Sequence, residues 1–269
     1  MPMCELDGTS LAYDDVGDGP AVVLLHAGIA DRRMWTPLLE RLADRHRVVA
    51  YDLRGYGESA RPTASFAHHD DVVGLLDRLG VDEAALVGCS SGGAVAIDAA
   101  LAHPDRVAGL ALLGSAVSGH RWSESDELWD QVVGDVDETD LDAVAAAEVR
   151  FWVVGPDRRP QDVDAGLIAF AETMNRRALA AEATIEQVGV RELRPPAVQR
   201  LGEVSAPTLV TAGAADVPEL RRLADRLAAE IPYGRRLADV PDSGHLLPLE
   251  RPEPVAIALL DFFAEIASH

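Results

Sequence analysis

Short apolar runs alternate along this chain with longer segments whose apolar residues recur every three or four positions. Residues 31–45 show the second pattern: their apolar side chains fall on one helical face, and Asp31 stands where an N-cap is expected. Residues 84–90 show the first pattern, a short apolar run typical of a buried strand. Regular alternation of the two predicts an α/β fold with a mostly parallel central sheet and helices on both of its faces.

The same pattern gives several elements well-marked ends. Helix 68–80 is expected to end at Gly80, and helix 91–103 to stop just before Pro104. Further helices are expected over 31–45, 217–231 and 254–267. The expected strands are two within residues 10–28, joined by the Gly-Asp-Gly-Pro turn at 17–20, and then 47–53, 84–90, 106–115, 208–213 and 235–245.

The alternation stops in the middle of the chain. Between about Ser115 and Arg200 no strand-like run interrupts three stretches of helical period, 126–133, 140–154 and 164–183. After Pro207 the alternation resumes. We therefore expect a core built from residues 1–114 and 201–269, with residues 115–200 forming a helical cap inserted after the sixth strand.

Charge and composition exclude several classes of function. The formal net charge is −21, and because an acidic surface repels phosphate, neither nucleic acid nor an anionic membrane is an expected partner. All 24 basic residues are arginine. The lack of lysine excludes a P-loop, a pyridoxal Schiff base and a Ser-x-x-Lys acyl-enzyme. Cys4 and Cys89 are too few for a disulfide framework or a four-thiolate zinc site.

The chain shows neither a signal peptide nor a run of about 18 apolar residues, so we expect a soluble, cytoplasmic protein. His68 and His69, followed by two acids, form a cluster that suggests a metal site. Because no third ligand follows at a useful spacing, we interpret them as a solvated helix N-terminus. No cofactor and no metal are expected.

The stretch 88–92, Gly-Cys-Ser-Ser-Gly, fits the pattern GxSxG with Ser90 at its centre. Only Ser90 has glycine two positions before and after it, whereas Cys89 and Ser91 do not. A strand precedes the motif and a helix follows it, which is the setting of a nucleophile on a sharp turn. A dinucleotide-binding turn has the same setting, but its GxGxxG pattern is not matched. Ser90 is the predicted nucleophile, and Cys89 is expected to pack beneath it as a buried thiol.

A serine nucleophile needs a general base, and His245 is the best candidate. His245 lies between the last expected strand and the last helix, at the carboxyl edge of the sheet, where catalytic groups of parallel sheets collect. His26 also ends a strand, but the small-residue turn after it favours a role in holding a loop by hydrogen bonds.

The base in turn needs an orienting acid, for which three aspartates compete. Asp216 follows the penultimate strand, next to the strand that leads to His245, and the order Ser90, Asp216, His245 is that of one known triad arrangement. Asp242, three residues before His245, is the competitor and fits a loop cap better. Asp52, at another strand end, is a second and less favoured acid.

The oxyanion formed during acyl transfer needs two backbone N–H donors. One is expected from Ser91, at the start of the helix after the nucleophile, and the other from Gly28, in the small-residue turn after strand 21–26.

With these residues in hand, the chain resembles the α/β-hydrolase family over nearly its whole length, most closely its esterases, cofactor-independent haloperoxidases and 3-oxoadipate enol-lactonases. The resemblance implies the α/β-hydrolase fold and acyl transfer to water, with Ser90 attacking a carbonyl, His245 moving the proton and Asp216 orienting the imidazole. A serine at 90 argues against the haloalkane dehalogenase and epoxide hydrolase branches, which need a carboxylate there. Five segments carry the resemblance: "LLHAG", "YDLRGYGES", "VGCSSGG", "APTLVTAGAAD" and "SGHLLPLERP".

The sequence departs from the family pattern at two places. Ala27 stands where the family has the glycine of its His-Gly oxyanion turn, which leaves open a shift of that turn. Cys89 stands where a histidine or aromatic residue is common, and Ser91 where related haloperoxidases and lactonases often have methionine, so the pocket floor differs.

Aromatic and arginine residues of the expected cap are candidates for contact with substrate. The aromatic set, with one methionine, either lines the substrate pocket or packs the cap helices together: Trp129, Phe151, Trp152, Phe170 and Met174. The arginine set either receives a substrate carboxylate, as an enol-lactonase would need, or is solvated and paired with acids: Arg150, Arg158, Arg159, Arg176 and Arg177.

The leading hypothesis is therefore a hydrolase of a small-molecule carboxylic ester or lactone. The same triad also serves perhydrolysis, carbon–carbon bond hydrolysis or acyl transfer to another acceptor. A hydrolase-like fold used as a non-catalytic ligand receptor is the alternative from another class. The sequence leaves the natural substrate and the oligomeric state open, a homo-oligomer included.

Overall fold

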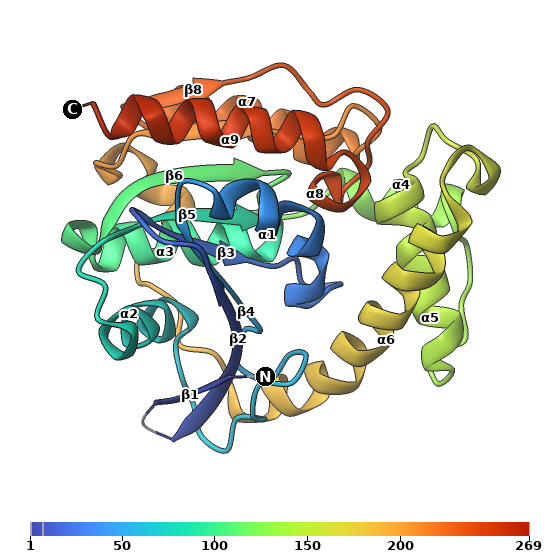
Figure 1. Ribbon diagram of the computed structural model, residues 1–269. Helices are drawn as coiled ribbons and strands as arrows, with labels where there is room; N and C mark the ends of the chain where they lie inside the picture. Colours follow the sequence, from blue (N-terminus) through green and yellow to red (C-terminus); the bar gives the residue numbers. More distant parts are fainter. Residues whose placement is uncertain (1, 7, 269) are drawn as a thin grey trace.

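A mostly parallel sheet of eight strands runs through the part of the chain that the computed structural model describes, residues 2–6 and 8–268 (Figure 1). Its strand order is β1-β2-β4-β3-β5-β6-β7-β8. Strands β4 to β8 and β3 run parallel, while β1 and β2 are antiparallel to their neighbours. The strands are β1 (Met3–Leu6), β2 (Thr9–Val16), β3 (Ala21–Leu25), β4 (Arg47–Tyr51), β5 (Ala84–Cys89), β6 (Val107–Leu113), β7 (Thr208–Thr211) and β8 (Gly234–Arg236).

The predicted α/β architecture is thus confirmed, with two differences at the edges of the sheet. Strand β1 was not predicted, because four residues that pair only with β2 leave too short a pattern to recognise. Strand β8 ends at Arg236, although the apolar pattern continues to residue 240. Beyond β8 an isolated bridge joins Gly213 to Val240, so the chain still runs alongside β7 toward His245.

Helices cover both faces of the sheet, and their ends follow the predicted signals. Asp31 accepts a hydrogen bond from the backbone amide of Arg33 at 3.1 Å, and Gly80 closes α2 in the left-handed region with φ of 65°. These helices are η1 (Arg32–Trp35), α1 (Thr36–Ala43), α2 (His68–Leu79), α3 (Ser91–Ala102), η2 (Pro104–Arg106), η6 (Leu201–Glu203), α7 (Pro218–Glu230), α8 (Leu247–Glu250) and α9 (Pro252–Ile266).

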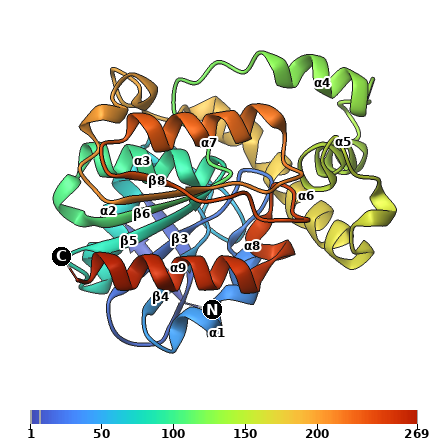
Figure 2. The ribbon, with the colours of Figure 1, turned by 90° about the horizontal axis from the view of Figure 1, so that it is seen from above.

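The two faces of the sheet carry separate apolar cores. Val23 and Leu25 of β3 join a cluster with α2, α3 and α7, whereas Val22 and Leu24 join a cluster with α1 and α9. Figure 2 shows α9 on one side of the strands and α3 and α7 on the other. A strand buried on both faces reads as one continuous apolar run, which is why β3 and β5 were recognisable from sequence.

Residues 115–200, here called the cap segment, contain helices and no strand, as predicted. Helices α4, α5 and α6 lie beyond the end of the sheet at which β3, β5 and β6 finish (Figure 1). A stripe of buried residues on α6 recurs at spacings of three and four: Ala171, Met174, Ala178, Ala181 and Ile185. Ala171 and Met174 join the core cluster that includes Val149 and Val153 of η3, whereas Ala181 and Ile185 pack against Phe66. The helices are α4 (Glu124–Val132), α5 (Leu141–Glu148), the π-helix η3 (Val149–Val154), η4 (Pro160–Asp162), α6 (Ala165–Val188) and η5 (Ala197–Gln199).

Candidate active site

A cavity of about 420 Å³ lies between the carboxyl ends of the central strands and the cap segment. Strands β4 and β5 flank β3, so the chain passes from β3 to β4 toward one edge of the sheet and from β5 to β6 toward the other edge. In open α/β sheets, ligands bind in the crevice at such a switch point. The residues that line the cavity are Gly28, Ile29, Ser90, Ser91, Ala116, Trp122, Glu148, Trp152, Glu182, Leu220 and His245.

Ser90 sits on a sharp turn between β5 and α3, with φ of 52° and ψ of −120°. A non-glycine residue at positive φ is strained, and such strain persists only where the surroundings enforce it. A Cβ atom at Gly88 would lie 2.5 Å from the Gly92 carbonyl oxygen, and one at Gly92 would lie 2.2 Å from the Leu25 carbonyl oxygen. The two glycines of the motif therefore allow strand and helix to approach, and the predicted strand-turn-helix setting of Ser90 is confirmed.

His245 faces the cavity from the loop after β8, and Asp216 lies behind it. The imidazole Nδ1 is 3.0 Å from Asp216 Oδ2, and both side chains are buried. The backbone amide of Val217 donates to the other carboxylate oxygen at 2.8 Å. A carboxylate partner favours the tautomer with Nδ1–H donating, which leaves Nε2 as the free proton acceptor.

Space beside this pair is made by Gly114, which has φ of 52°. A Cβ atom there would lie 2.8 Å from Asp216 Oδ2 and 3.4 Å from His245 Nδ1. A larger residue at 114 would therefore displace the acid or the imidazole.

The two competing acids lie elsewhere. Asp242 has a side chain 84% exposed, with Arg251 3.6 Å away. Asp52 is buried and accepts from the backbone amides of Arg32 and Glu58, both at 2.8 Å. Of the three candidate acids, Asp216 is the one in contact with His245.

Gly28 and Ser91 lie side by side at the cavity floor, where a Cβ atom on Gly28 would be 2.9 Å from Ser91 Oγ. Ser91 is the first residue of α3, and the first backbone N–H groups of a helix have no partner within it. The turn also brings Ile29 to the cavity wall, although Ala27 itself is buried in the core. The two predicted oxyanion donors thus belong to one surface with Ser90.

His26 holds this turn in place. Its Nδ1 donates to the Ala27 carbonyl at 2.8 Å, and its Nε2 accepts from the Leu53 backbone amide at 3.0 Å. Burial lowers the pKa of His26, so the ring is neutral and makes both bonds at once. The prediction that His26 anchors a loop is confirmed.

Cys89 lies beneath the turn, fully buried in the core cluster on the α1 and α9 face. Its Sγ is 3.5 Å from the carbonyl oxygen of His245, and burial raises the pKa of the thiol well above its ordinary value. The expected packing of Cys89 is confirmed.

Of the five cap residues proposed to contact substrate, Trp152 lines the cavity. Its ring centroid is 5.2 Å from that of His245, and its carbonyl accepts from the His245 backbone amide at 3.2 Å. Phe151 and Met174 are buried at 1% and 0% exposure, Trp129 packs against Phe151, and Phe170 lies under Arg33. These four pack cap helices or contact Arg33, and none of them is among the cavity-lining residues.

None of the five cap arginines lines the cavity either. Each has another partner: the Gly155 carbonyl for Arg150, Glu250 for Arg158, Asp162 for Arg159, Asp142 for Arg176 and the Gly57 carbonyl for Arg177. The interpretation that they are paired or occupied with other groups is therefore the one that the structure supports.

Sequence reasoning missed six of the cavity residues: the apolar Ile29, Ala116 and Leu220, and the aromatic or acidic Trp122, Glu148 and Glu182. Glu148 ends α5, and the Asn175 amide donates to its carboxylate at 2.7 Å. Burial raises the pKa of both glutamates, and the charge of Glu148 adds to the rise at Glu182. Glu148 stands four residues before Trp152, a helical spacing that would have signalled a shared face.

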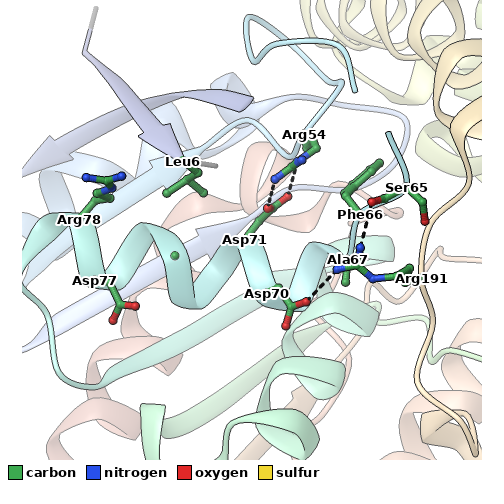
Figure 3. A pocket seen from close by; sticks show the side chains of 11 residues that line it. Leu6, Arg54, Ser65, Phe66, Ala67, Asp70, Asp71, Asp77, Arg78 and Arg191 are labelled. Atoms are coloured by element: carbon green, nitrogen blue, oxygen red, sulfur yellow. Dashed lines mark hydrogen bonds and ion pairs between the residues drawn. The ribbon is translucent and has the colours of Figure 1, made fainter. Parts of the chain in front are cut away.

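A second cavity, of about 370 Å³, lies beside α2 and β1 and contains none of the proposed catalytic residues (Figure 3). Two pairs of its charged side chains are in contact: Arg54 Nε donates to Asp71 at 2.9 Å, and Arg191 is 3.3 Å from Asp70. The residues that line it include Ser65 but no histidine, so they hold no serine–histidine pair.

His68 and His69 do not form a solvated helix start, because His69 is buried at 8% exposure and the pKa of His68 is lowered to about 3 by burial. Across residues 2–6 and 8–268, no group of three or more His, Cys, Asp or Glu side chains is arranged to hold a metal ion. In the same ranges, no helix is long and apolar enough to span a bilayer.

Comparison with known proteins places the geometry in a family. The family profile described as "alpha/beta hydrolase fold" matches residues 20–252. A 3-oxoadipate enol-lactonase of Acinetobacter baylyi is 28% identical over 88% of this chain and 85% of its own length. A candidate carbamate hydrolase of Caulobacter sp. (strain K31) is 29% identical over 94% of this chain and 95% of its own length.

Among solved structures, a thermophilic esterase from Thermogutta terrifontis is 30% identical, covers 96% of this chain and 94% of its own, and superimposes with a TM-score of 0.78. The profile match spans most of the chain, and these relatives are hydrolytic enzymes. The chain therefore belongs to the α/β-hydrolase family and is a hydrolase.

Proposed function

We propose that this enzyme hydrolyses a small-molecule carboxylic ester or lactone through a covalent acyl-enzyme on Ser90. The observation that carries the proposal is the array at one cavity: a strained serine at the carboxyl end of β5, and a histidine whose Nδ1 is bonded to a buried aspartate at 3.0 Å. This is the arrangement that activates a serine hydroxyl, because the imidazole accepts its proton and the carboxylate stabilises the imidazolium that forms.

In the first half of the reaction, Ser90 Oγ attacks the substrate carbonyl carbon while its proton passes to His245 Nε2. The backbone amides of Gly28 and Ser91 hold the negative oxygen of the tetrahedral intermediate. The bond to the leaving oxygen then breaks, and His245 returns the proton to that oxygen. A water molecule attacks the acyl group in the second half, again through His245, and releases the acid.

The relatives support this chemistry by what they are named for: an esterase and an enol-lactonase stand among them. An N-acyl homoserine lactone degrading enzyme also superimposes on this chain, with a TM-score of 0.76 at 28% identity. Ester and lactone substrates share the acyl carbon that Ser90 would attack. Serine at 90 also supports acyl transfer over the dehalogenase reaction of another relative, haloalkane dehalogenase 2.

A fluorophosphonate tests the nucleophile directly. Intact-mass analysis is expected to show one adduct on the wild-type protein, none on Ser90→Ala, and an unchanged adduct on the control variant Ser91→Ala. An adduct that persists in Ser90→Ala would overturn the assignment.

A panel of 4-nitrophenyl esters and simple lactones tests the reaction. Turnover by the wild type and its loss in Ser90→Ala are expected. A protein that forms the adduct but turns over no ester or lactone would point to perhydrolysis, carbon–carbon bond hydrolysis or acyl transfer to another acceptor. A protein that neither reacts nor turns over substrate would point to the non-catalytic receptor.

A further inference from the structure

Two carboxylates face the proposed substrate cavity from the cap segment, and no arginine does. Glu148 comes from the end of α5 and Glu182 from α6, and both line the same cavity as Ser90 and His245. The arginines that a substrate carboxylate would need are bonded elsewhere, as described above. The charged wall opposite the nucleophile is therefore negative.

The two glutamates are close enough to affect each other. The charge of Glu148 raises the pKa of Glu182, and the partly buried phenol of Tyr56 has its pKa raised by burial and, to a smaller extent, by both carboxylates. Glu148 accepts a hydrogen bond from Asn175, which is 1% exposed, so its carboxylate is held in a fixed place. Two partly buried acids held together repel each other and lower stability unless a positive group joins them.

Glu148 and Glu182 are not part of a structural ion pair in the described parts of the chain. Within residues 2–6 and 8–268, neither Glu148 nor Glu182 makes a salt bridge with an arginine or histidine. By contrast, Glu250, whose side chain is 5% exposed, is paired with Arg158 at 2.9 Å. Two partly buried acids that share a cavity without a positively charged partner cost free energy, which points to a cationic ligand as the missing partner.

Aromatic rings complete the same wall. Trp122 and Trp152 both line the cavity, with ring centroids 6.3 Å apart and planes at 74°. Indole faces attract cations, and a cage of tryptophan rings with carboxylates suits an alkylated ammonium group better than a bare metal ion. The net charge of −21 also draws cations toward the surface.

We propose that the substrate carries a positively charged nitrogen, an ammonium or quaternary ammonium group, which Glu148, Glu182 and the two tryptophans bind while Ser90 attacks the ester or lactone carbonyl. This inference rests on the proposed function and narrows its substrate class. It excludes the carboxylate-bearing substrates that an enol-lactonase would take, because the substrate carboxylate would face two acids.

Three 4-nitrophenyl esters of matched shape test the proposal: those of 4-(trimethylammonio)butanoic acid, its neutral carbon isostere 5,5-dimethylhexanoic acid, and glutaric acid as the anionic monoester. At about pH 8 the wild-type kcat/KM is expected to be at least about tenfold higher for the cation than for the neutral ester, and lowest for the anion. Equal values for the cationic and neutral esters, or preference for the anion, would overturn the proposal.

Charge-removing variants identify the residues responsible. In the double variant Glu148→Gln with Glu182→Gln, the ratio of kcat/KM for the cationic ester to that for the neutral ester is expected to fall by about tenfold. Glu172→Gln is the matched control, because Glu172 lies on the same helix α6 and does not line the cavity. Survival of the preference in the double variant would overturn the proposal.

A binding measurement separates this inference from the proposed function. Calorimetry with benzyltrimethylammonium on Ser90→Ala, which cannot turn over, is expected to show binding that weakens about tenfold when both glutamates are replaced by glutamine. Absence of binding, or binding that ignores the glutamates, would overturn the inference. A wild type without esterase activity whose Ser90→Ala variant still binds the cation through the glutamates would overturn the proposed function alone.

Discussion

The acidic side chains on the two walls of the cavity differ in whether they have a basic partner within the chain. On the sheet side, Asp216 is 1% exposed and bonded to His245, and it takes a further hydrogen bond from the Val217 amide. On the cap side, Glu148 and Glu182 are partly buried next to each other, with burial raising the pKa of both. One acid has its partner inside the chain, and the other two face the space where substrate would lie.

The sheet side of the cavity, here called the sheet wall, carries the residues proposed for the reaction, and the cap side, the cap wall, carries those proposed to select the substrate. The sheet wall is assembled by backbone: a strained serine, glycines that allow close approach, and a loop fixed by His26. Such a wall fixes geometry to fractions of an ångström, as chemistry demands. The cap wall is assembled by side chains on helices, whose charge and shape change without disturbing the nucleophile. We therefore expect changes on the first wall to abolish turnover and changes on the second to alter which substrate is preferred.

The largest expected effect tests the paired acid. Asp216→Asn is expected to lower kcat by roughly a thousandfold or more, because the amide no longer holds the imidazole with its Nδ1 protonated. Asp242→Asn, at the exposed residue three positions before His245, is the control and is expected to leave kcat within about twofold of wild type. Steady-state kinetics on a 4-nitrophenyl ester, with circular dichroism to check folding, decide the matter. A large loss at Asp242 alone would reverse the assignment.

The next effect tests how the two walls are joined. Arg158 donates to the carbonyls of Val153 and Val154 at 2.6 and 2.8 Å and pairs with buried Glu250, which accepts from the Gly244 amide. Arg158→Ala leaves the Glu250 charge unpaired, and a fall of about 3 kcal/mol in the free energy of unfolding is expected in urea titrations.

Arg159→Ala is the matched control for that measurement. Arg159, next to Arg158 in the chain, makes an exposed ion pair with Asp162, and exposed pairs of this kind contribute little to the free energy of unfolding. The urea midpoint of Arg159→Ala is expected to equal that of wild type. Equal losses in both variants would show that the link between η3 and the His245 loop is no stronger than a surface contact.

A further effect tests how much a buried acid outside the cavity, Asp98, lowers the free energy of unfolding when it has no positively charged partner. Asp98 on α3 is 8% exposed, accepts from Ser118 at 2.7 Å, and has its pKa raised from 3.8 to about 6 by burial. A raised pKa means that the folded protein binds a proton more tightly than the unfolded chain, so stability falls as pH rises from about 4 to about 6. Asp98→Asn is therefore expected to be more stable than wild type by about 3 kcal/mol above that window and equal below it.

Unfolding measured at several pH values tests this expectation, and ester selectivity measured alongside it sharpens the comparison. Asp98→Asn is expected to keep the cationic preference, whereas Glu182→Gln, which also removes a carboxylate with a raised pKa, is expected to lose part of it. If the difference in the free energy of unfolding between Asp98→Asn and wild type did not change with pH, the pKa of Asp98 would not be raised by folding, and the expectation would be wrong.

The smallest effect concerns the aromatic part of the cap wall. Trp122 is 38% exposed at the edge of the cavity, and an exposed cation–π contact contributes about 0.5–1 kcal/mol. Trp122→Leu is expected to reduce the cationic preference by about two- to fivefold without changing kcat for the neutral ester. A change in kcat for both esters would mean instead that Trp122 acts through the position of Trp152 and His245.

Local sequence was enough for the sheet wall, because its signals lie within a few residues of the side chain they position. Glycine register selected Ser90, the apolar runs located β5 and β7, and the chain order suggested Asp216 and His245. The choice of Asp216 over Asp242 used adjacency of strands, and in the fold Asp216 is indeed the acid that contacts the imidazole. The edge strand β1 was missed because four residues carry too little pattern.

The sequence by itself therefore determined the family, the alternating core and the turn that carries the proposed nucleophile, since strand, turn and helix follow from the period of apolar residues and the conformational freedom of glycine. Only the tertiary structure decided which cap residues face the cavity. Phe151 and Trp152 are neighbours of similar chemistry, yet the π-helix buries one and turns the other toward His245. Composition shows how many acids and arginines the chain has, but pairing depends on contacts between distant segments, and these left Glu148 and Glu182 facing the substrate space.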